Sequence, residues 1–400
     1  MLNSDVFDND KIKSLDFTDI YRLVNPIKIL DDTNAWAYDY YSIREILNEY
    51  SGLPNDYDIK ALVEHAPHFT DYLEHGYRVH EIYPSIVCSS FRESIISSVP
   101  NNNGVYAVGP YIAYAKQALS DEKIKIEKER LGSNLLVFPA HSTWGIQANY
   151  DFDDFCNEIK KVGKEYDSIR VCLYWKDVLL NFGELYKKEG FEVVTAGHMY
   201  DFMFFSRLKS LITTSTMTMS NGAGSQIGFS VYLKKPHYLY NPIFDFKKIV
   251  EDGEQADSQY QIVQDVKNRF QGVTDLLAYN FSSMEENITK DQLSIVDKYW
   301  GINHVKSSKE LKTIILACEG YYSLKNNSNN RIITLENENR RLSESVKDIN
   351  HLKSQINNYE KKLNIQKKKL INEKKLVQNL QSSKSWRITK PLRVLRKKLK

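Results

Sequence analysis

The sequence predicts an α/β protein built around a doubly wound parallel sheet. Between residues 134 and 240, five short apolar runs have the composition of buried strands. A segment with apolar residues at helical spacing separates each run from the next, and a turn of small residues follows the fourth run. Short apolar strands joined by helical crossovers are typical of parallel sheets. Ligands bind to such sheets outside the carboxyl ends of the strands.

Strands and helices of this predicted sheet alternate along the chain. The strands are expected at residues 135–138, 169–175, 191–195, 213–219 and 237–240. The helices between them are expected at residues 151–163, 177–190, 204–211 and 225–235. Asp177 is a possible cap at the start of the second helix, and Gly190 is a C-cap signal at its end.

The turn after the fourth strand is the most informative local motif. It contains Ser220, Asn221, Gly222 and Gly224, and Ser225 is expected to be the N-cap of the helix that follows. A strand that runs through such a turn into a helix directs backbone N–H groups and a partial positive charge toward one point. The turn therefore predicts a phosphate site, although many units of this kind bind nothing.

Polar or aromatic side chains mark the ends of the other predicted strands. His141, Ser142 and Thr143 follow the first strand, Trp175 ends the second, and His198 follows the third. Because the carboxyl ends of parallel strands share one edge, we expect these residues to cluster with the glycine turn. Each has an ordinary structural alternative, since hydroxyls cap helices, histidines hydrogen-bond loops, and tryptophan packs in cores.

Residues 1–130 predict a smaller α/β domain that faces the central one. Strands are expected at 59–63, 79–83, 85–88 and 105–108, with helices over 36–50 and 91–98. Four of the nine histidines lie between residues 65 and 80. Histidine and carboxylate near a strand end suit proton transfer at neutral pH, so His65 or Glu64 is a candidate base, with a hydrogen-bonded loop as the alternative. The spacing is not HExxH, so no metal site is expected.

Composition and charge limit the class of protein. Four scattered cysteines without CxxC spacing indicate a reducing compartment. The polar N-terminus does not resemble a signal peptide, and no apolar run has the length of a transmembrane helix. Residues 331–400 hold 20 Lys/Arg and 6 Asp/Glu, whereas residues 1–330 hold 34 and 45, so an acidic head precedes a basic tail. The acidic head argues against a nucleic-acid partner.

The tail predicts a long helix and a basic end. A polar hinge is expected at residues 326–330. One apolar seam then repeats every seven residues, at Leu335, Leu342, Ile349, Ile356, Leu363, Leu370 and Val377. We expect residues 331–382 to form a coiled coil that self-associates, with a single charged helix as the alternative. Residues 384–400 combine eight basic side chains with Trp and aliphatic residues, which is typical of segments that dock on an anionic membrane surface.

Five stretches of the central region are similar to glycosyltransferase-like proteins of the GT-B fold that act in bacterial surface-polysaccharide (capsule and O-antigen) biosynthesis. They are LLVFPAHSTWG (135–145), SIRVCLYWKDVL (168–179), FEVVTAGHMYD (191–201), RLKSLI (207–212) and SNGAGSQIGFSVYLKKPHYL (220–239). The resemblance implies two Rossmann-type domains. The second would hold a nucleotide-sugar donor, and the first would present a lipid-linked or growing glycan as acceptor.

The same resemblance implies roles for individual residues. His65 or Glu64 would deprotonate the acceptor hydroxyl. Asp151, Phe152 and Asp153 begin a predicted helix rather than following a strand, so a metal-independent mechanism is expected, with no cofactor besides the nucleotide sugar. The donor site would comprise His141, Ser142, Thr143, His198, Ser220, Asn221, Gly222, Gly224 and Ser225.

Two other interpretations stay open. The head could transfer a polyol phosphate from a CDP-glycerol-type donor, or it could be a non-catalytic scaffold with a degenerate transferase head. The expected order is an acceptor-side domain (1–130), a donor domain (131–282), a helical segment and hinge (283–330), a coiled coil (331–382) and a basic tail (383–400). The protein is expected to be cytoplasmic and peripheral at the inner face of the cytoplasmic membrane.

Overall fold

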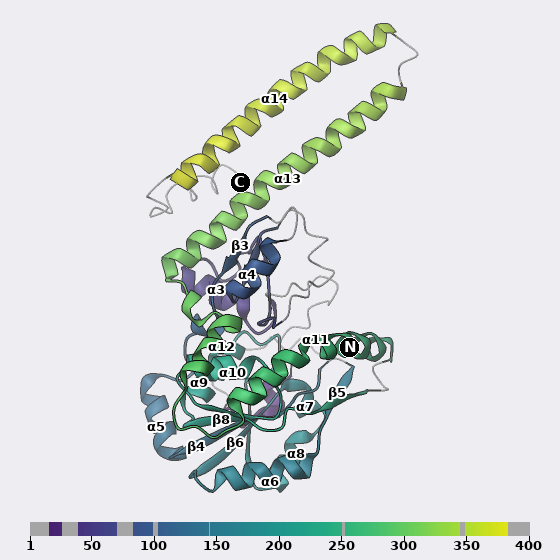
Figure 1. Cartoon of the computed structure of the whole chain (residues 1–400). Helices are drawn as coiled ribbons and strands as arrows, with labels where there is room; N and C mark the ends of the chain where they lie inside the picture. The colour runs from purple at the N-terminus through teal and green to yellow at the C-terminus, as the bar shows by residue number, and fades with distance from the viewer. Residues whose placement is uncertain are drawn as a thin grey trace.

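The computed structural model describes residues 16–25, 39–69, 83–98, 103–143, 145–249, 253–344 and 349–382. It shows an α/β head from which two long helices project (Figure 1). The central sheet has five parallel strands in the order β7-β6-β4-β8-β9. The predicted five-stranded parallel sheet is therefore confirmed. The strands are β4 (Asn134–Phe138), β6 (Ser168–Leu173), β7 (Glu192–Thr195), β8 (Met217–Ser220) and β9 (His237–Leu239).

Helices cover both faces of this sheet. α6 (Phe152–Gly163) and α8 (Phe182–Lys188) lie on one face, and α9 (Phe204–Thr213) and α10 (Ser225–Tyr232) lie on the other (Figure 1). Successive residues of a strand point to opposite faces, so each strand serves both layers. Leu135 and Val137 of β4 belong to the same buried cluster as α6, whereas Leu136 and Phe138 belong to that of α9.

Two strand boundaries differ from the prediction. The second strand ends at Leu173, because Trp175 already begins α7 (Trp175–Leu179). The fourth strand begins at Met217 rather than at residue 213, because the β-branched run before it closes α9. Thr214 Oγ1 donates a hydrogen bond to the Ser210 carbonyl at 2.8 Å. This bond four residues back along the chain lets threonine fit a helix end despite its strand preference.

The N-terminal unit is a smaller parallel sheet. Its described strands are β1 (Leu62–Val63), β2 (Ser85–Val87) and β3 (Val105–Ala107), paired in that order. α2 (Ile20–Leu23), α3 (Ile43–Ser51), α4 (Ser90–Ser97) and the 3-10 helix η3 (Tyr111–Ala113) complete the described N-terminal elements. Most of the strand expected at 79–83 lies outside the described residues, and Tyr83 is not in a strand. Within the residues described, this is a small parallel α/β unit rather than a complete Rossmann-type domain.

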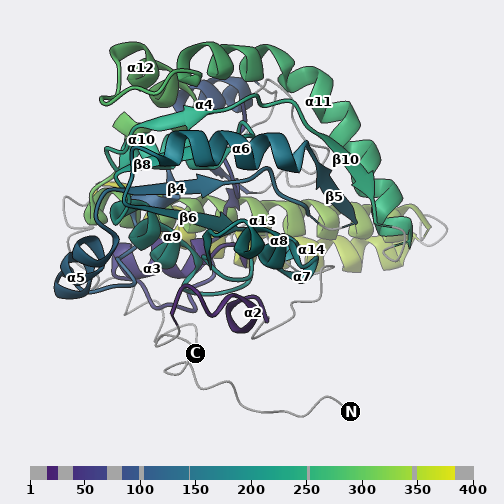
Figure 2. The same ribbon diagram turned by 90° about the horizontal axis from the view of Figure 1, so that it is seen from below.

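An antiparallel ribbon beside the central sheet was not predicted. β5 (Ile146–Asn149) pairs with β10 (Asp245–Lys248). β10 is polar and mostly exposed, so no apolar pattern marks it in the sequence. α11 (Gly253–Phe281) contacts both strands and runs alongside them (Figure 2). Before β4, α5 (Asp121–Leu131) leads the chain into the central sheet.

The chain after α11 returns to the N-terminal unit and joins the two sheets. α12 (Lys290–Trp300) ends in the fully buried Trp300, and a Cβ on Gly228 of α10 would lie 2.3 Å from its ring. The next residue, Gly301, has φ of 68°, and its Cβ would lie 2.2 Å from the Cys88 carbonyl after β2. The glycines therefore permit close contact on both sides of Trp300, and one hydrophobic core extends through both units.

The tail forms a helical hairpin. After η5 (Ile302–His304), α13 (Ser308–Glu344) runs without a break through residues 326–330, so the predicted hinge there is wrong. α14 (Ile349–Ser382) runs antiparallel beside α13 in both views (Figures 1 and 2), and Asn327 Nδ2 donates to Glu373 Oε2 at 3.0 Å. The helix predicted over 331–382 is therefore two helices, and self-association of this region stays a prediction.

The predictions about membranes concern the basic segment at the end of the chain and the absence of a membrane-spanning helix. The basic segment at 384–400 lies outside the described residues. Among the helices that are described, none combines the length and the apolar content that crossing a bilayer requires.

Candidate functional site

The carboxyl edge of the central sheet gathers most of the predicted site residues. Phe138 at the end of β4 is paired with Ser220 at the end of β8, and Leu173 of β6 is paired with Thr195 of β7. The loops that follow these four strands therefore begin side by side. These are the loops of His141, His198 and Asn221, together with the residue pair Tyr174–Trp175, so the predicted meeting of separate loops at one edge is observed.

Two buried side chains from other segments hold the loop after β4. Asn221 Oδ1 accepts a hydrogen bond from the Ala140 N–H at 2.6 Å. The Asp177 carboxylate accepts the Ser142 N–H at 3.0 and 3.3 Å. Ser142 Oγ in turn accepts the Ala148 N–H at 3.0 Å. Asn221, Asp177 and Ser142 are all buried, so they shape this loop rather than line an open site.

His141 is the exposed member of the same loop. Its Nδ1 lies 3.1 Å from the Ser142 carbonyl, and its ring lies 4.3 Å from that of Tyr174. The residue as a whole is exposed, whereas desolvation of its ring by the surrounding protein lowers the pKa of the imidazole. His141 therefore contributes exposed surface at the sheet edge. Thr143, the next candidate, is half-buried and exchanges backbone hydrogen bonds with Ile146.

Asp177 has the most perturbed carboxyl group of this edge. Burial raises its pKa to about 7, although the hydrogen bonds from Ser142 act in the opposite direction. Asp177 sits in the first turn of α7, where the N-cap is Tyr174. The prediction that Asp177 caps a helix is therefore wrong, because its carboxylate faces the neighbouring loop instead.

The glycine turn lies against the loop after β4. A Cβ on Gly222 would be 3.3 Å from the Cβ of Ala140, so the absence of a side chain allows the two loops to touch. The helix that follows begins at Ser225 with Gly224 as its N-cap and no side-chain cap, so the prediction of Ser225 as N-cap is wrong. The first N–H groups of α10 therefore have no side-chain acceptor at this cap, as an anion-binding helix start requires.

The hydroxyl of Ser220 is engaged inside the protein. Ser220 Oγ donates to the Gly222 carbonyl at 3.1 Å and lies 2.9 Å from His237 Nε2. His237 Nδ1 lies 2.8 Å from Thr218 Oγ1, so the ring joins two hydroxyls of β8. Burial lowers the pKa of His237 to about 3, which keeps the ring neutral. Ser220 thus fixes the start of the glycine turn.

His198 is buried beneath the sheet edge. Its ring packs 4.4 Å from that of Trp175 and 5.4 Å from that of Tyr200, and its Nδ1 accepts the Tyr200 N–H at 3.2 Å. Burial lowers its pKa to about 4. The loop itself is held by Arg207, whose Nη1 donates to Asp201 Oδ2 at 2.6 Å and to the Ala196 carbonyl at 3.2 Å.

A pair of tyrosines connects the two units at this edge. The Tyr174 hydroxyl, after β6, shares a hydrogen bond of 2.8 Å with the Tyr41 hydroxyl, just before α3. The Tyr41 ring stacks with the half-buried His65, with centroids 6.3 Å apart. Tyr41 also has φ of 60°, an uncommon conformation for a residue with a side chain. His141 and His65 therefore flank one tyrosine pair from opposite units.

Glu64 does not share this position. Its carboxylate forms an ion pair with Arg92, and both side chains are buried. A carboxylate held by arginine in the interior is a poor proton acceptor. Glu64 is therefore the weaker of the two candidate bases. His68 lies beside His65, with a ring separation of 6.3 Å, and burial lowers its pKa to about 3.

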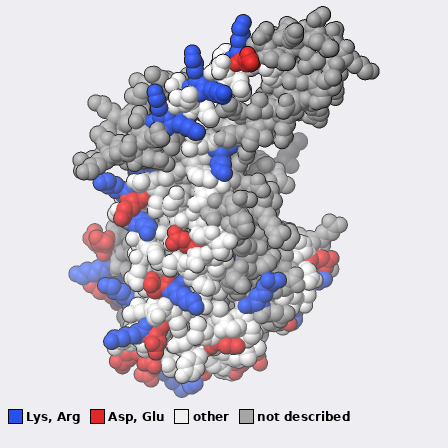
Figure 3. Space-filling model, turned by 45° about the horizontal axis from the view of Figure 1, so that its top comes forward, with Lys and Arg blue, Asp and Glu red and all other residues white. Residues whose placement is uncertain are grey.

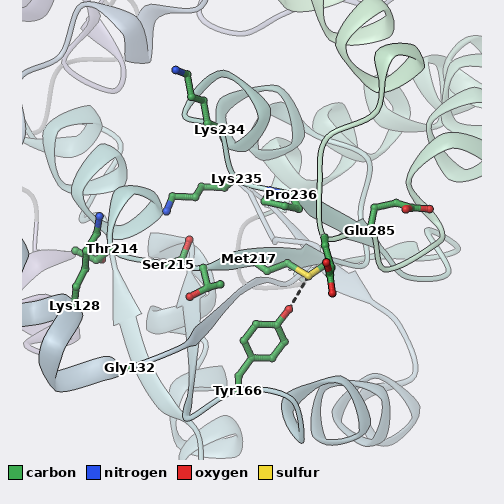
Figure 4. Close-up of a pocket in the computed structure, with 12 residues that line it drawn as sticks. Lys128, Gly132, Tyr166, Thr214, Ser215, Met217, Lys234, Lys235, Pro236 and Glu285 are labelled. Atoms are coloured by element: carbon green, nitrogen blue, oxygen red, sulfur yellow. Dashed lines mark hydrogen bonds between the residues drawn. The ribbon is translucent and has the colours of Figure 1, made fainter.

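A pocket of about 490 Å³ lies at the opposite, amino edge of the sheet (Figure 4). The three lysines that line it lie at the carboxyl ends of helices. Lys128 is in the last turn of α5, and Lys234 and Lys235 come just after α10. Helix carboxyl ends carry partial negative charge that lysines complement. The remaining lining residues are Gly132, Tyr166, Thr214, Ser215, Thr216, Met217, Pro236, Glu285 and Glu286. Helix amino ends, which favour phosphate, gather at the other edge.

Metal binding has no support at this site. Among the residues described, no three His, Cys, Asp or Glu side chains are grouped so as to hold a metal ion.

Comparison with known proteins gives little information about this chain. No protein-family model matches the chain, and no curated protein matches it. Among solved structures, the chain is similar to the wall teichoic acid polymerase TagF, with 12% identity, a TM-score of 0.33, and coverage of 66% of this chain and 68% of that one. At this TM-score the likeness supports no conclusion about fold or activity.

Several important residues were missed by sequence reasoning. The sequence pattern points to Trp175, which is buried, rather than to its neighbour Tyr174, and it indicates no role for Tyr41 or His237. Tyr174 follows a strand, so its position was a usable signal. The partners of Tyr41 and His237 lie 133 and 17 to 19 residues away, and no local pattern announces them.

Proposed function

We propose that the head is a transferase that binds a nucleotide-activated donor at the carboxyl edge of the central sheet and an acceptor from the N-terminal unit. One observation carries this proposal: His141 and His65, from opposite units, flank the hydrogen-bonded pair Tyr41 and Tyr174. A group-transfer enzyme needs a donor and an acceptor on opposite sides of the reacting bond. The junction between the units supplies the two sides.

In this proposal the donor phosphate binds the backbone N–H groups at the start of α10. No side chain caps the helix at Gly224, so a phosphate oxygen would accept hydrogen bonds from the N–H groups of Gly224 and Ser225. His141 and Thr143 would approach the donor from the neighbouring loop. The buried side chains of Ser142, Ser220, Asn221 and His198 would act by shaping these loops, because their polar atoms are already hydrogen-bonded within the protein.

His65 is proposed as the base. It would accept the proton of the acceptor hydroxyl while that oxygen bonds to the donor carbon and the bond from this carbon to the phosphate oxygen breaks. The nucleotide leaves with the electron pair, and the positive end of α10 stabilises its developing charge. For a glycosyltransferase the donor is a nucleotide sugar, and the acceptor that the sequence resemblance suggests is a lipid-linked or growing glycan.

The same constellation would also serve transfer of a polyol phosphate. A phosphate held at α10 and a histidine base are equally suited to attack on phosphorus, with the phosphate anhydride bond breaking instead. A screen that offers labelled nucleotide sugars and labelled CDP-glycerol as donors separates the two activities. Label from CDP-glycerol appears in the product only if the protein transfers a polyol phosphate. A scaffold without catalysis would bind neither donor.

Nucleotide binding is the first test. UDP, GDP, CDP, CMP and dTDP are added to the full chain, and the nucleotide that binds should raise the melting temperature in a concentration-dependent way. His141→Ala should reduce this shift. Lys164→Ala, an exposed residue at the far end of α6, is the matched control and should leave it unchanged. His65→Gln should keep the shift but lose turnover. An unchanged shift in His141→Ala would refute the donor site, and no shift with any nucleotide would favour the scaffold.

A further inference from the structure

α14 carries a concentration of lysines that the proposed transferase activity does not use. Between residues 359 and 375 the chain has seven lysines, two glutamates and no arginine. All seven lysines are exposed. Figure 3 shows the basic side chains along the projecting hairpin. The lysines are Lys361, Lys362, Lys367, Lys368, Lys369, Lys374 and Lys375.

The lysine face, formed by Lys361, Lys368 and Lys375, is opposite the face that packs on α13. Tyr359, Leu363, Gln366, Leu370 and Glu373 alternate at spacings of four and three residues and are half-buried, so they form the inner seam. Lys361, Lys368 and Lys375 are seven residues apart, and an α-helix places them on the side opposite this seam. From the first to the third, the helix rises about 21 Å.

The described carboxylates do not neutralise this face. Glu373 lies in the inner seam and accepts a hydrogen bond from Asn327. No described carboxylate is within ion-pair distance of any of the seven lysines. A row of like charges on one helix repels itself, so a complementary anionic surface would be attracted to it.

Apolar side chains on the same exposed surface distinguish between anionic partners. Ile365 lies between the lysines of the outer face and is 58% exposed, and Ile371 is 52% exposed. A bilayer interface accepts aliphatic side chains beneath lysines whose long stems reach the lipid headgroups. Nucleic-acid sites favour arginine for bidentate contacts to bases and phosphates, and α14 has none.

We propose that the outer face of α14, centred on Lys361, Lys368 and Lys375, docks on the surface of an anionic phospholipid membrane. The hairpin then lies along the membrane with α14 against the headgroups and α13 above it. This contact is independent of the transferase proposal and of the segment 384–400, which lies outside the described residues.

Vesicle co-sedimentation of the full chain tests the proposal. The wild type should sediment with vesicles of phosphatidylglycerol and phosphatidylcholine, not with phosphatidylcholine alone, and salt should weaken the binding. Lys361→Glu/Lys368→Glu/Lys375→Glu should lower partitioning at least about 100-fold, since each lysine near an anionic leaflet contributes about fivefold. The neutral variant with three Gln substitutions should show a smaller loss, and Ile365→Ser should weaken binding further.

A matched charge reversal on the head is the control. Lys123→Glu/Lys164→Glu/Lys188→Glu alters three exposed lysines of α5, α6 and α8, at the other end of the molecule (Figure 1), with the same change in net charge. This variant should bind vesicles like the wild type, and circular dichroism should show native helix content in all variants. Wild-type binding by the α14 variant, or an equal loss in the control, would overturn the proposal. So would tighter binding of duplex nucleic acid than of anionic vesicles.

Discussion

Replacing Asp177 by asparagine removes a buried charge while keeping an oxygen that accepts the Ser142 N–H. Burial raises the pKa of Asp177 from 3.8 to about 7 in the folded protein. A difference of about 3 pKa units corresponds to about 4 kcal/mol between the two protonation states. Well below pH 3.8 the carboxyl is protonated in both the folded and the unfolded chain, and it then adds nothing to the pH dependence of the free energy of unfolding.

The sign of the pH dependence follows from this raised pKa. Between about pH 4 and pH 7 the folded protein binds a proton that the unfolded chain has lost, so the free energy of unfolding falls as pH rises. The Asp177→Asn variant has no carboxyl group at this position, so its free energy of unfolding does not fall in this way as the pH rises. Its stability relative to the wild type should therefore increase by roughly 2–3 kcal/mol between pH 5 and pH 8.

Urea denaturation at the two pH values, followed by tryptophan fluorescence, measures the effect. The difference between variant and wild type is the useful quantity, because His198 and His237 have lowered pKa values and change wild-type stability in the opposite direction as pH falls. Asp56→Asn, at an exposed position, is the control and should give the same difference at both pH values. An Asp177→Asn advantage that does not change between pH 5 and pH 8 would refute the argument.

Three further predictions concern the packing of the fold. Gly228→Ala places a Cβ 2.3 Å from the tryptophan ring of α12 and should cost roughly 1–3 kcal/mol in urea denaturation, whereas Gly272→Ala, with no atom within 4 Å, should gain about 0.5–1 kcal/mol. His237→Ala removes the ring that joins two β8 hydroxyls and should cost about 2–4 kcal/mol; a loss under 1 kcal/mol would contradict its structural role. A disulfide between Asn327→Cys and Glu373→Cys should form within one chain on a non-reducing gel, because the four native cysteines are buried; a cross-linked dimer would instead favour the self-associating coil.

The central sheet could be predicted because its signals are local. Each strand is a short apolar run, each crossover has helical spacing, and parallel connection follows from the length of the crossovers. The same rule places His141, His198 and Asn221 at one edge of the sheet without reference to any tertiary contact. The errors at residue 213 and at Trp175 are boundary errors, where neighbouring helices took residues with strand-like composition.

The pattern of apolar runs does not predict which polar side chains are already hydrogen-bonded or ion-paired inside the protein. Ser142 and Ser220 look alike in the sequence, as hydroxyls after strands, yet both are committed to partners inside the protein. Glu64 and His65 are neighbours, but only the carboxylate is consumed by Arg92, 28 residues away. Such pairings depend on where distant segments cross, and this information is spread over the whole chain.

The tail separates the two kinds of information most clearly. A seven-residue apolar repeat by itself determines that one side of a helix is buried, because side-chain direction follows from helix geometry. It does not determine what covers that side, since an intrachain hairpin and a dimer place the same residues in the seam. Only the tertiary structure put α14 back against α13, through contacts such as that of Asn327 with Glu373, and so turned the lysine face outward.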